Sequence, residues 1–278
     1  MAYRLVFARE RPLLAGAASV YADRMLSGKL NKFLKVAVRW AGVVVNLCGV
    51  KGLQRLPRYL RDWHVYAKAA GRPIRIVDSY PCLGDATHGT SFDPHYFYQG
   101  AWLARRLVQL RPPRHVDISS SVQTVSVISA FVETTFIDYR VLRVSLPGLE
   151  CVQGDLLALD LPSESVPSLS CMHVIEHVGL GRYGDPIDPH GSEKAAMELV
   201  RVLARSGTFF LTVPVGRERV CFNAHRIFFP QTVLEMFKCL ELRSFAYVDD
   251  ERQFHDAASP ADAENCDYGC GMFCFVKP

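Results

Sequence analysis

The chain has 278 residues, of which 49% are hydrophobic and 22% are charged. A chain of this size and composition forms a substantial core without disulfides, so intrinsic disorder and a coiled coil are excluded. The net charge of +4 is too small to indicate a nucleic-acid-binding protein, and no nucleic acid is expected as a partner.

Positive charge is concentrated in the first quarter of the chain. Residues 1–70 carry 13 lysines and arginines against three acidic residues, and the rest of the chain is net acidic. We predict a basic helical N-terminal extension here. Within residues 20–50, apolar positions alternate with Lys29, Lys32 and Lys35 in a helical pattern. This pattern suits peripheral contact with an anionic membrane, and equally a helix that packs on the main domain with its charged face in solvent.

The sequence predicts a cytoplasmic protein, with membrane association through residues 20–50 left open. Arg4, Arg9 and Arg11 interrupt every early apolar stretch, so no cleavable signal is expected. The apolar stretch 40–50 is far shorter than the roughly 20 residues of a spanning helix. The nine scattered cysteines are odd in number, which favours reduced thiols.

Residues 71–100 are rich in proline and glycine and are expected to form a loop, either a lid or pocket wall or an ordinary connection. From residue 101 onward, extended and helical patterns alternate. We therefore predict a Rossmann-like α/β domain over 101–278, with a mostly parallel sheet and helices on both faces. Strands are expected at 114–119, 134–140, 150–157, within 167–178, and at 208–215, 242–248 and 271–276, with helices at 101–110, 122–131, 192–204 and 230–239.

Three carboxylates stand where the first three predicted strands end. Asp117 ends the first strand, and Asp138 ends the second, 21 positions later. A carboxylate at the end of the second strand is placed to accept both hydroxyls of a ribose. Asp155 follows the third strand, where an adenine ring would lie.

Two further motifs follow these carboxylates. One is a strand that runs into a loop at 170–177, and the other is the segment 198–203 that leads through Gly207 into the strand 209–214. Together with the three carboxylates, they make the chain resemble class I S-adenosylmethionine-dependent methyltransferases. A narrower resemblance is carried by EHVGLGRYGDP from Glu176 and FNAHR from Phe222. It is to a methyltransferase-like family of unknown function, some of whose members accompany surface-polysaccharide genes. PCLGD at 81–85 and YFYQ at 96–99 extend it back to about residue 60.

The resemblance implies S-adenosylmethionine as the cofactor and methyl transfer to a small acceptor that is anionic or carbohydrate-linked. It places the cofactor against Asp117, Ser119, Asp138, Asp155, Leu156 and His173. A hydroxyl acceptor must lose a proton, for which the candidate bases are His177, His225 and Asp185. The acceptor is expected to contact Arg182, Tyr183, Asn223 and Arg226.

Structural alternatives remain open for these residues. Each histidine can be a hydrogen-bonded structural residue. The segment 181–186 can be a tight turn with an internal ion pair between Arg182 and Asp185. Asp138 can be an exposed strand end.

The turn after the first strand departs from the methyltransferase pattern. Glycines are usual where this chain has Ser119, Ser121 and Gln123. Side chains there would crowd the methionine portion of the cofactor or force a different turn. This departure keeps a second hypothesis open, namely a protein that retains the fold as a non-catalytic or altered-ligand binding module.

No metal site is predicted. His173, Glu176 and His177 match the H-x-x-E-H pattern of inverted zinc peptidases. That mechanism needs a helix, whereas the flanking β-branched residues favour a strand and Gly179 would end a helix at once. Glu176 and His177 remain weaker candidates, because some quinone-pathway O-methyltransferases with a similar Glu-His bind a divalent metal. We interpret Cys266, Cys270 and Cys274 as core or incidental thiols.

Overall fold

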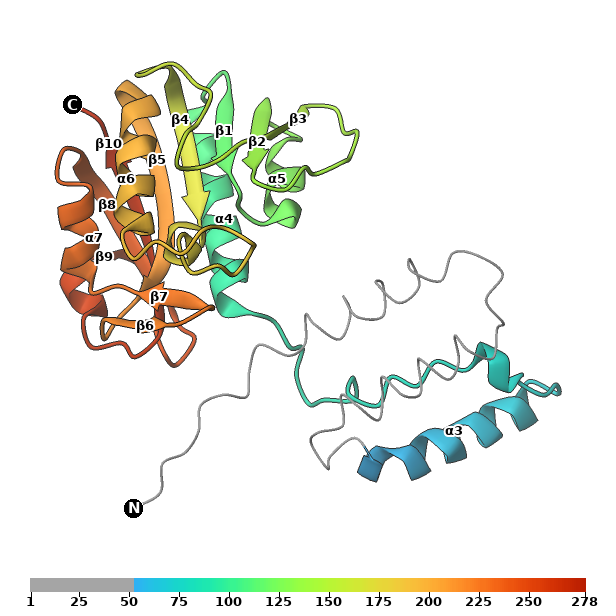
Figure 1. Ribbon diagram of the computed structural model, residues 1–278. Coiled ribbons are helices and arrows are strands. Elements are labelled where there is room, and N and C mark those ends of the chain that lie inside the picture. The colour runs from blue at the N-terminus through green and yellow to red at the C-terminus, as the bar shows by residue number, and fades with distance from the viewer. Residues whose placement is uncertain (1–52) are drawn as a thin grey trace. The chain divides into compact units, whose positions relative to one another are not determined.

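The computed structural model describes residues 53–278, which lie in two units divided after Ser91 (Figure 1). The predicted membrane contact of residues 20–50 falls outside the described residues, as does most of the basic extension. The described part of the first unit has short 3-10 helices at Leu53–Arg55 and Ile76–Asp78 and one α-helix, α3 (Leu56–Ala69). No helix within residues 53–278 combines the length and apolar character needed to span a membrane.

The second unit begins with helix α4 (Pro94–Leu110), which starts earlier than the sequence suggested. The expectation of a loop through residue 100 was wrong for its last seven residues. Asp93 caps this helix, because its carboxylate accepts hydrogen bonds from the backbone N–H groups of His95 and Tyr96. Pro94 at the first helical position supplies a favourable φ angle. The early start places aromatic side chains on a rigid element.

An eight-stranded sheet forms the centre of the second unit and confirms the predicted mostly parallel α/β fold (Figure 1). The strand order is β3-β2-β1-β4-β5-β10-β8-β9. The first five strands are parallel, and β10 runs antiparallel between β5 and β8. The strands are β1 (His115–Ile118), β2 (Thr134–Asp138), β3 (Leu149–Gln153), β4 (Val166–Met172), β5 (Leu203–Val215), β8 (Glu241–Val248), β9 (Phe254–Ala258) and β10 (Gly269–Val276).

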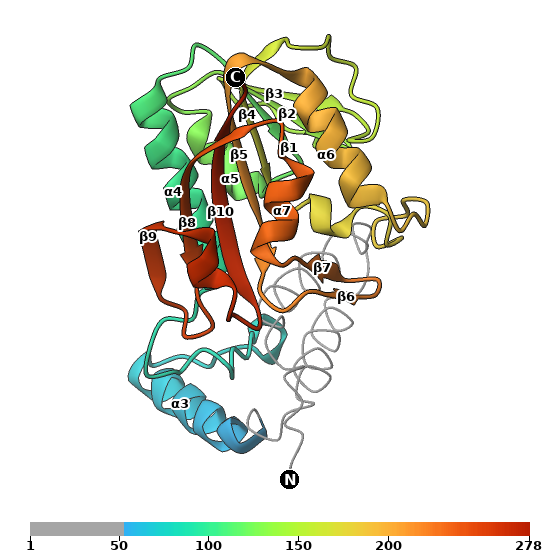
Figure 2. The same ribbon diagram turned by 90° about the vertical axis from the view of Figure 1, so that its left-hand side faces the viewer.

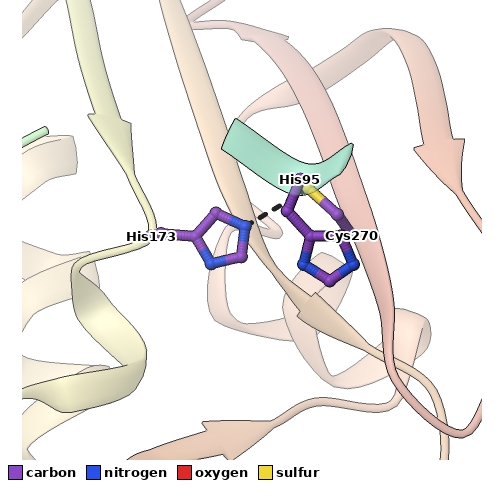
Figure 3. A group of neighbouring side chains, drawn as sticks. All are labelled: His95, His173 and Cys270. Carbon is purple, nitrogen blue, oxygen red and sulfur yellow. Dashed lines mark hydrogen bonds between the residues drawn. The ribbon is translucent and has the colours of Figure 1, made fainter. Parts of the chain in front are cut away.

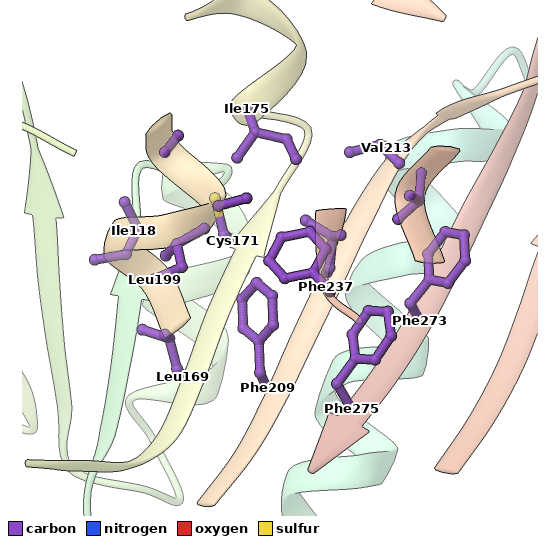
Figure 4. Close-up of a cluster of buried hydrophobic side chains, with 14 of the residues drawn as sticks. Ile118, Leu169, Cys171, Ile175, Leu199, Phe209, Val213, Phe237, Phe273 and Phe275 are labelled. Atoms are coloured by element: carbon purple, nitrogen blue, oxygen red, sulfur yellow. The ribbon is translucent and has the colours of Figure 1, made fainter. Parts of the chain in front are cut away.

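Helices cover both faces of this sheet, with α4 and α5 (Val122–Ile128) on one and α6 (Gly191–Val202) and α7 (Pro230–Met236) on the other (Figure 2). Successive residues of a strand point to opposite faces. On β5, Phe209 packs with the α6 and α7 side while Phe210 packs with the α4 and α5 side. The ring of Phe209 contacts those of Phe237 and Phe275 (Figure 4). The apolar runs of the sequence therefore form two buried layers of side chains, one on each face of the sheet.

Two short features were missed by the sequence analysis. The hairpin of β6 (Arg219–Cys221) and β7 (His225–Ile227) has strands of three residues, too short for a period-2 pattern to be recognised. Strand β9 at the sheet edge was also missed. The hairpin matters for function because β7 carries the predicted site residues His225 and Arg226.

A chain of buried polar groups crosses the inside of the sheet. The ring of His115 lies 2.8 Å from the hydroxyls of both Ser168 and Ser170. Ser170 in turn donates to the carboxylate of Asp117. All four residues have 0% exposure. Burial raises the pKa of Asp117 to about 6 and lowers that of His115 to about 3.

The stability difference between Asp117→Asn and the wild type is expected to depend on pH. A raised folded-state pKa means that Asp117 stabilises the fold below about pH 4 and that this contribution is lost as the pH rises through about 6. An asparagine carries no charge, and its side-chain oxygen can still accept from the Ser170 hydroxyl. The variant should therefore gain about 2 kcal/mol relative to the wild type between pH 4 and pH 8. Urea unfolding at a series of pH values measures this gain, and a constant difference would contradict the prediction.

Candidate functional site

The order of the parallel strands reverses between β1 and β4, and in such sheets ligands bind outside the carboxyl ends of the strands at that point. The turn after β1 occupies one side of this position. Ser119 has a φ angle of +53°, in the left-handed region that glycine adopts most easily. The chain therefore keeps a glycine-type conformation at the first position where methyltransferases usually have glycine.

Hydrogen bonds hold this turn to its neighbouring strands. The Ser119 hydroxyl donates to the carbonyl of Ile137 on β2 at 3.1 Å, so the side chain is directed back toward the sheet. The Ser120 hydroxyl accepts from the backbone N–H of Met172 on β4 at 3.1 Å. Asp117 accepts from the backbone N–H of Ser120 at 3.1 Å and is fully buried, so it acts on a ligand only through the turn that it holds.

The other predicted cofactor residues lie at the ends of their strands. Asp138 ends β2 with a side chain 16% exposed, and its Oδ1 accepts from the backbone N–H of Arg140 at 2.7 Å. Asp155 is exposed just beyond β3 and accepts from the N–H of Leu157 at 2.9 Å. The neighbouring Leu156 is 8% exposed.

His173 follows the last residue of β4 and is held on both sides of its ring. Its Nδ1 lies 2.9 Å from Oε1 of Glu176, and its Nε2 lies 3.3 Å from Sγ of Cys270 on β10. Glu176 has 0% exposure, and within residues 53–278 its Oε2 has no hydrogen-bond partner. Burial opposes protonation of His173, but the charges of Cys270 and Glu176 outweigh it and raise its pKa.

A continuous series of aromatic rings surrounds the end of β4, and we call it the His–Tyr cluster. Neighbouring ring centroids lie 5.1 to 6.4 Å apart. The rings come from α4, the loops after β4 and before β10, and strand β7. In order of contact they are Tyr96, His173, His95, Tyr268, His225, His177 and Tyr183.

Within the cluster, His177 has the geometry of a general base. Its Nδ1 donates to the carbonyl of Ala224 at 2.6 Å, which leaves Nε2 as the basic nitrogen of the neutral ring. Nε2 lies 3.8 Å from Oε1 of Glu176, whose charge would stabilise the protonated ring. Burial lowers the pKa of His177 below its ordinary value, so the ring is neutral near pH 7. The ring of the second predicted base, His225, lies between those of His177 and Tyr268.

Asp185, the third predicted base, is occupied as an acceptor in the loop after β4. Its carboxylate accepts from the backbone N–H groups of Gly179, Gly181 and Tyr183 at 2.7 to 3.3 Å. Burial opposes ionisation of the carboxyl, but these hydrogen bonds outweigh it and lower its pKa. A carboxylate so engaged is a weak base, and its structural effect is to fix the loop that carries Arg182 and Tyr183.

The predicted acceptor-binding arginines differ in availability. Arg226, predicted to bind the acceptor, is 7% exposed, and its Nη1 and Nη2 donate to four backbone carbonyls of the protein itself. Arg182 is exposed, donates to the carbonyl of Ala224 at 3.1 Å, and lies over the ring of Tyr183. Asn223 donates to the carbonyl of Leu180 at 3.3 Å. Arg182 and Tyr183 remain open to a ligand at the surface.

His95 and Tyr268 were missed as site residues, although they stand in the middle of the His–Tyr cluster. The Asp-Pro pair at 93–94 was a signal for a helix start, which would have placed His95 on the first turn of α4. No local signal marks Tyr268, because its position depends on the antiparallel insertion of β10 between β5 and β8.

A separate hollow of about 390 Å³ lies over β1, β2 and β3. It is lined by apolar residues such as Val116, Ile137 and Val152 and by polar residues such as Glu150 and Gln153. None of the His–Tyr cluster residues lines it.

Comparison with known proteins identifies similar folds. Residues 163–265 match the family described as "Caenorhabditis protein of unknown function, DUF268", which is less than half of the chain. No curated protein matches the sequence.

Several solved structures are similar at low identity. The N-methyltransferase NodS from Bradyrhizobium japonicum, in complex with S-adenosyl-L-homocysteine, is 13% identical, with 66% of this chain and 88% of that chain covered and a TM-score of 0.44. The 1,6-didemethyltoxoflavin-N1-methyltransferase of Burkholderia thailandensis is 12% identical, with 81% and 89% covered and a TM-score of 0.44. The [4+2]-cyclase SpnF is 16% identical, with 77% and 91% covered and a TM-score of 0.48. Function must therefore be argued from the site itself.

Proposed function

We propose that the protein is an S-adenosylmethionine-dependent methyltransferase that acts on a hydroxyl of a small, anionic or carbohydrate-linked acceptor. The observation that carries this proposal is the turn after β1, where Ser119 takes the left-handed conformation and directs its hydroxyl to Ile137. The serine therefore neither crowds the adjoining space nor forces a different turn. Asp138 on the adjacent strand supplies a carboxylate for the ribose hydroxyls.

The residues of the chain then divide between two tasks. The turn after β1 and the ends of β2 and β3 bind the cofactor, whose sulfonium supplies the methyl group. Methyl transfer is an in-line displacement, so the protein mainly positions the reactants and removes the acceptor proton. Nε2 of His177 takes that proton, and the buried carboxylate of Glu176 stabilises the resulting imidazolium.

An anionic acceptor is favoured by the arginines around Tyr183. The guanidinium of Arg182 lies 5.2 Å from the centre of this ring, and that of Arg140 lies 4.7 Å from it. Both side chains are exposed. Arginine matches the geometry of a carboxylate or phosphate through paired N–H donors. A sugar acid or sugar phosphate would satisfy this arrangement.

Titration calorimetry with S-adenosylhomocysteine tests the proposal. The wild type is expected to bind with roughly micromolar affinity. Asp138→Ala should weaken binding about 30-fold or more, because hydrogen bonds from ribose hydroxyls to a charged group are lost. Glu241→Ala removes an exposed carboxylate at the start of β8, at the end of the sheet opposite to the proposed cofactor site, and should bind as the wild type does.

The circular dichroism of both variants should match that of the wild type. A wild type that does not bind at millimolar ligand would refute the methyltransferase proposal in favour of the non-catalytic or altered-ligand protein. Equal affinity in Asp138→Ala would refute the placement of the ribose.

A further inference from the structure

Three side chains with metal-binding atoms converge beside the end of β4 (Figure 3). They are His95 from the first turn of α4, His173 after β4, and Cys270 near the start of β10. One ligand atom from each lies within 4.8 Å of the other two. The two histidines are each 9% exposed, and Cys270 is fully buried.

The spacing is close to that of a tetrahedral zinc site. Zinc–nitrogen distances near 2.0–2.1 Å and zinc–sulfur distances near 2.3 Å place tetrahedral ligand atoms roughly 3.3 to 3.6 Å apart. Nε2 of His173 and Sγ of Cys270 are already 3.3 Å apart. The ligand atom of His95 lies within 4.8 Å of both, and metal binding would draw it closer.

Hydrogen bonds to other parts of the protein already orient the rings of His95 and His173. Glu176 accepts from Nδ1 of His173 at 2.9 Å, which directs Nε2 toward Cys270. A carboxylate bonded to the far nitrogen of a ligand histidine is the usual support of such ligands. The ring of His95 is hydrogen-bonded to the backbone of Tyr268, two residues before Cys270.

We propose that His95, His173 and Cys270 bind a divalent zinc ion, with Glu176 as the positioning residue for His173. One thiolate and two imidazoles form a ligand set that suits zinc, whereas calcium and magnesium prefer oxygen. Three protein ligands leave one position of the tetrahedron for a water molecule. This ligand set differs from the Glu176–His177 pair considered from the sequence.

A catalytic cysteine is the competing interpretation of the same residues, because Cys270, His173 and Glu176 are arranged as nucleophile, base and orienting carboxylate. Two observations favour the metal. Cys270 has 0% exposure, which leaves no approach for a substrate carbon atom. His95 has no task in such a triad, although its ligand atom lies beside the thiol.

The metal content of the full-length chain tests the proposal. Protein produced with zinc in the medium and desalted should contain about one zinc per chain by elemental analysis. Cys270→Ser and His95→Gln should each reduce bound zinc at least tenfold. Cys274→Ser is the matched control, because Cys274 is also buried on β10 but lies outside the trio, and it should retain the wild-type content.

Two further readouts separate metal binding from a loss of folding. Cobalt added to the metal-free protein should give a near-ultraviolet thiolate-to-cobalt absorption that is absent in Cys270→Ser. Glu176→Gln should keep this absorption and weaken the metal affinity about 10- to 100-fold.

A folded wild type with less than a tenth of an equivalent of zinc and no cobalt–thiolate absorption would overturn the proposal and leave a hydrogen-bonded thiol and imidazole. Full zinc content in Cys270→Ser would also overturn it. Neither measurement uses S-adenosylmethionine, so the result is independent of the proposed methyl transfer.

Discussion

A His177→Gln variant is expected to bind S-adenosylhomocysteine as the wild type does and to transfer methyl groups about 100- to 10,000-fold more slowly. The glutamine amide can still donate to the carbonyl of Ala224, so the loop after β4 should keep its shape. Glutamine has no basic nitrogen that could take the proton from the hydroxyl that is methylated. The assay uses radiolabelled S-adenosylmethionine and whichever sugar acid or sugar phosphate the wild type methylates in a screen.

The pH profile of the wild type provides a second readout for this residue. Because burial lowers the pKa of His177, the neutral base persists below the ordinary histidine value of about 6.5. The acid limb of kcat/KM should therefore lie below that value and disappear in His177→Gln. His190→Gln, at an exposed histidine outside the cluster, is the control and should keep full activity. Full activity in His177→Gln would exclude His177 as the base.

Arg226→Met is expected to destabilise the fold by about 3 kcal/mol. The Arg226 guanidinium donates to the carbonyls of Glu176 and Val178 in one segment and to those of Asp188 and Pro189 in another. Methionine fills a similar volume but donates no hydrogen bond, which leaves these carbonyls without their charged partner. Urea unfolding at constant pH measures the loss.

Two further variants make this result specific to Arg226. Arg226→Lys should lose nearly as much stability, because an ammonium group cannot span the two segments as the planar guanidinium does. Arg182→Met removes an exposed arginine that also donates to a backbone carbonyl, and it should change the free energy of unfolding by less than about 0.5 kcal/mol. Equal effects at the two positions would contradict the buried, bridging role of Arg226.

The strands of the sheet could be predicted because the sequence pattern that marks each strand is local. Strands buried on both faces require continuous apolar runs, and those runs at 208–215 and 271–276 correspond to β5 and β10. The carboxylates Asp117 and Asp138 were identified because each was predicted to end a strand; Asp138 is the last residue of β2, whereas β1 extends one residue beyond Asp117. The start of α4 was also encoded locally, by Asp93 and Pro94, but the neighbouring glycines and prolines obscured it.

The roles of the polar site residues could not be predicted in the same way. Arg226 and Arg182 have the same side chain, and only packing shows that Arg226 joins two loops while Arg182 stays exposed. Likewise, Ser119 was expected to disturb the turn after β1, yet its hydroxyl bonds to a strand that lies beside it only in the folded sheet.

The sequence by itself determined the succession of the longer strands and helices along the chain, the two apolar faces of the sheet and the acidic residues near the strand ends, since periodicity and turn residues act over a few positions. The tertiary structure alone decided that His95, His173 and Cys270 meet. They are far apart in the chain and come together because β10 is inserted antiparallel beside β5 while α4 begins over the same edge. Chain reversal over such distances leaves no local pattern, so the convergence of these three side chains could only be seen in the folded molecule.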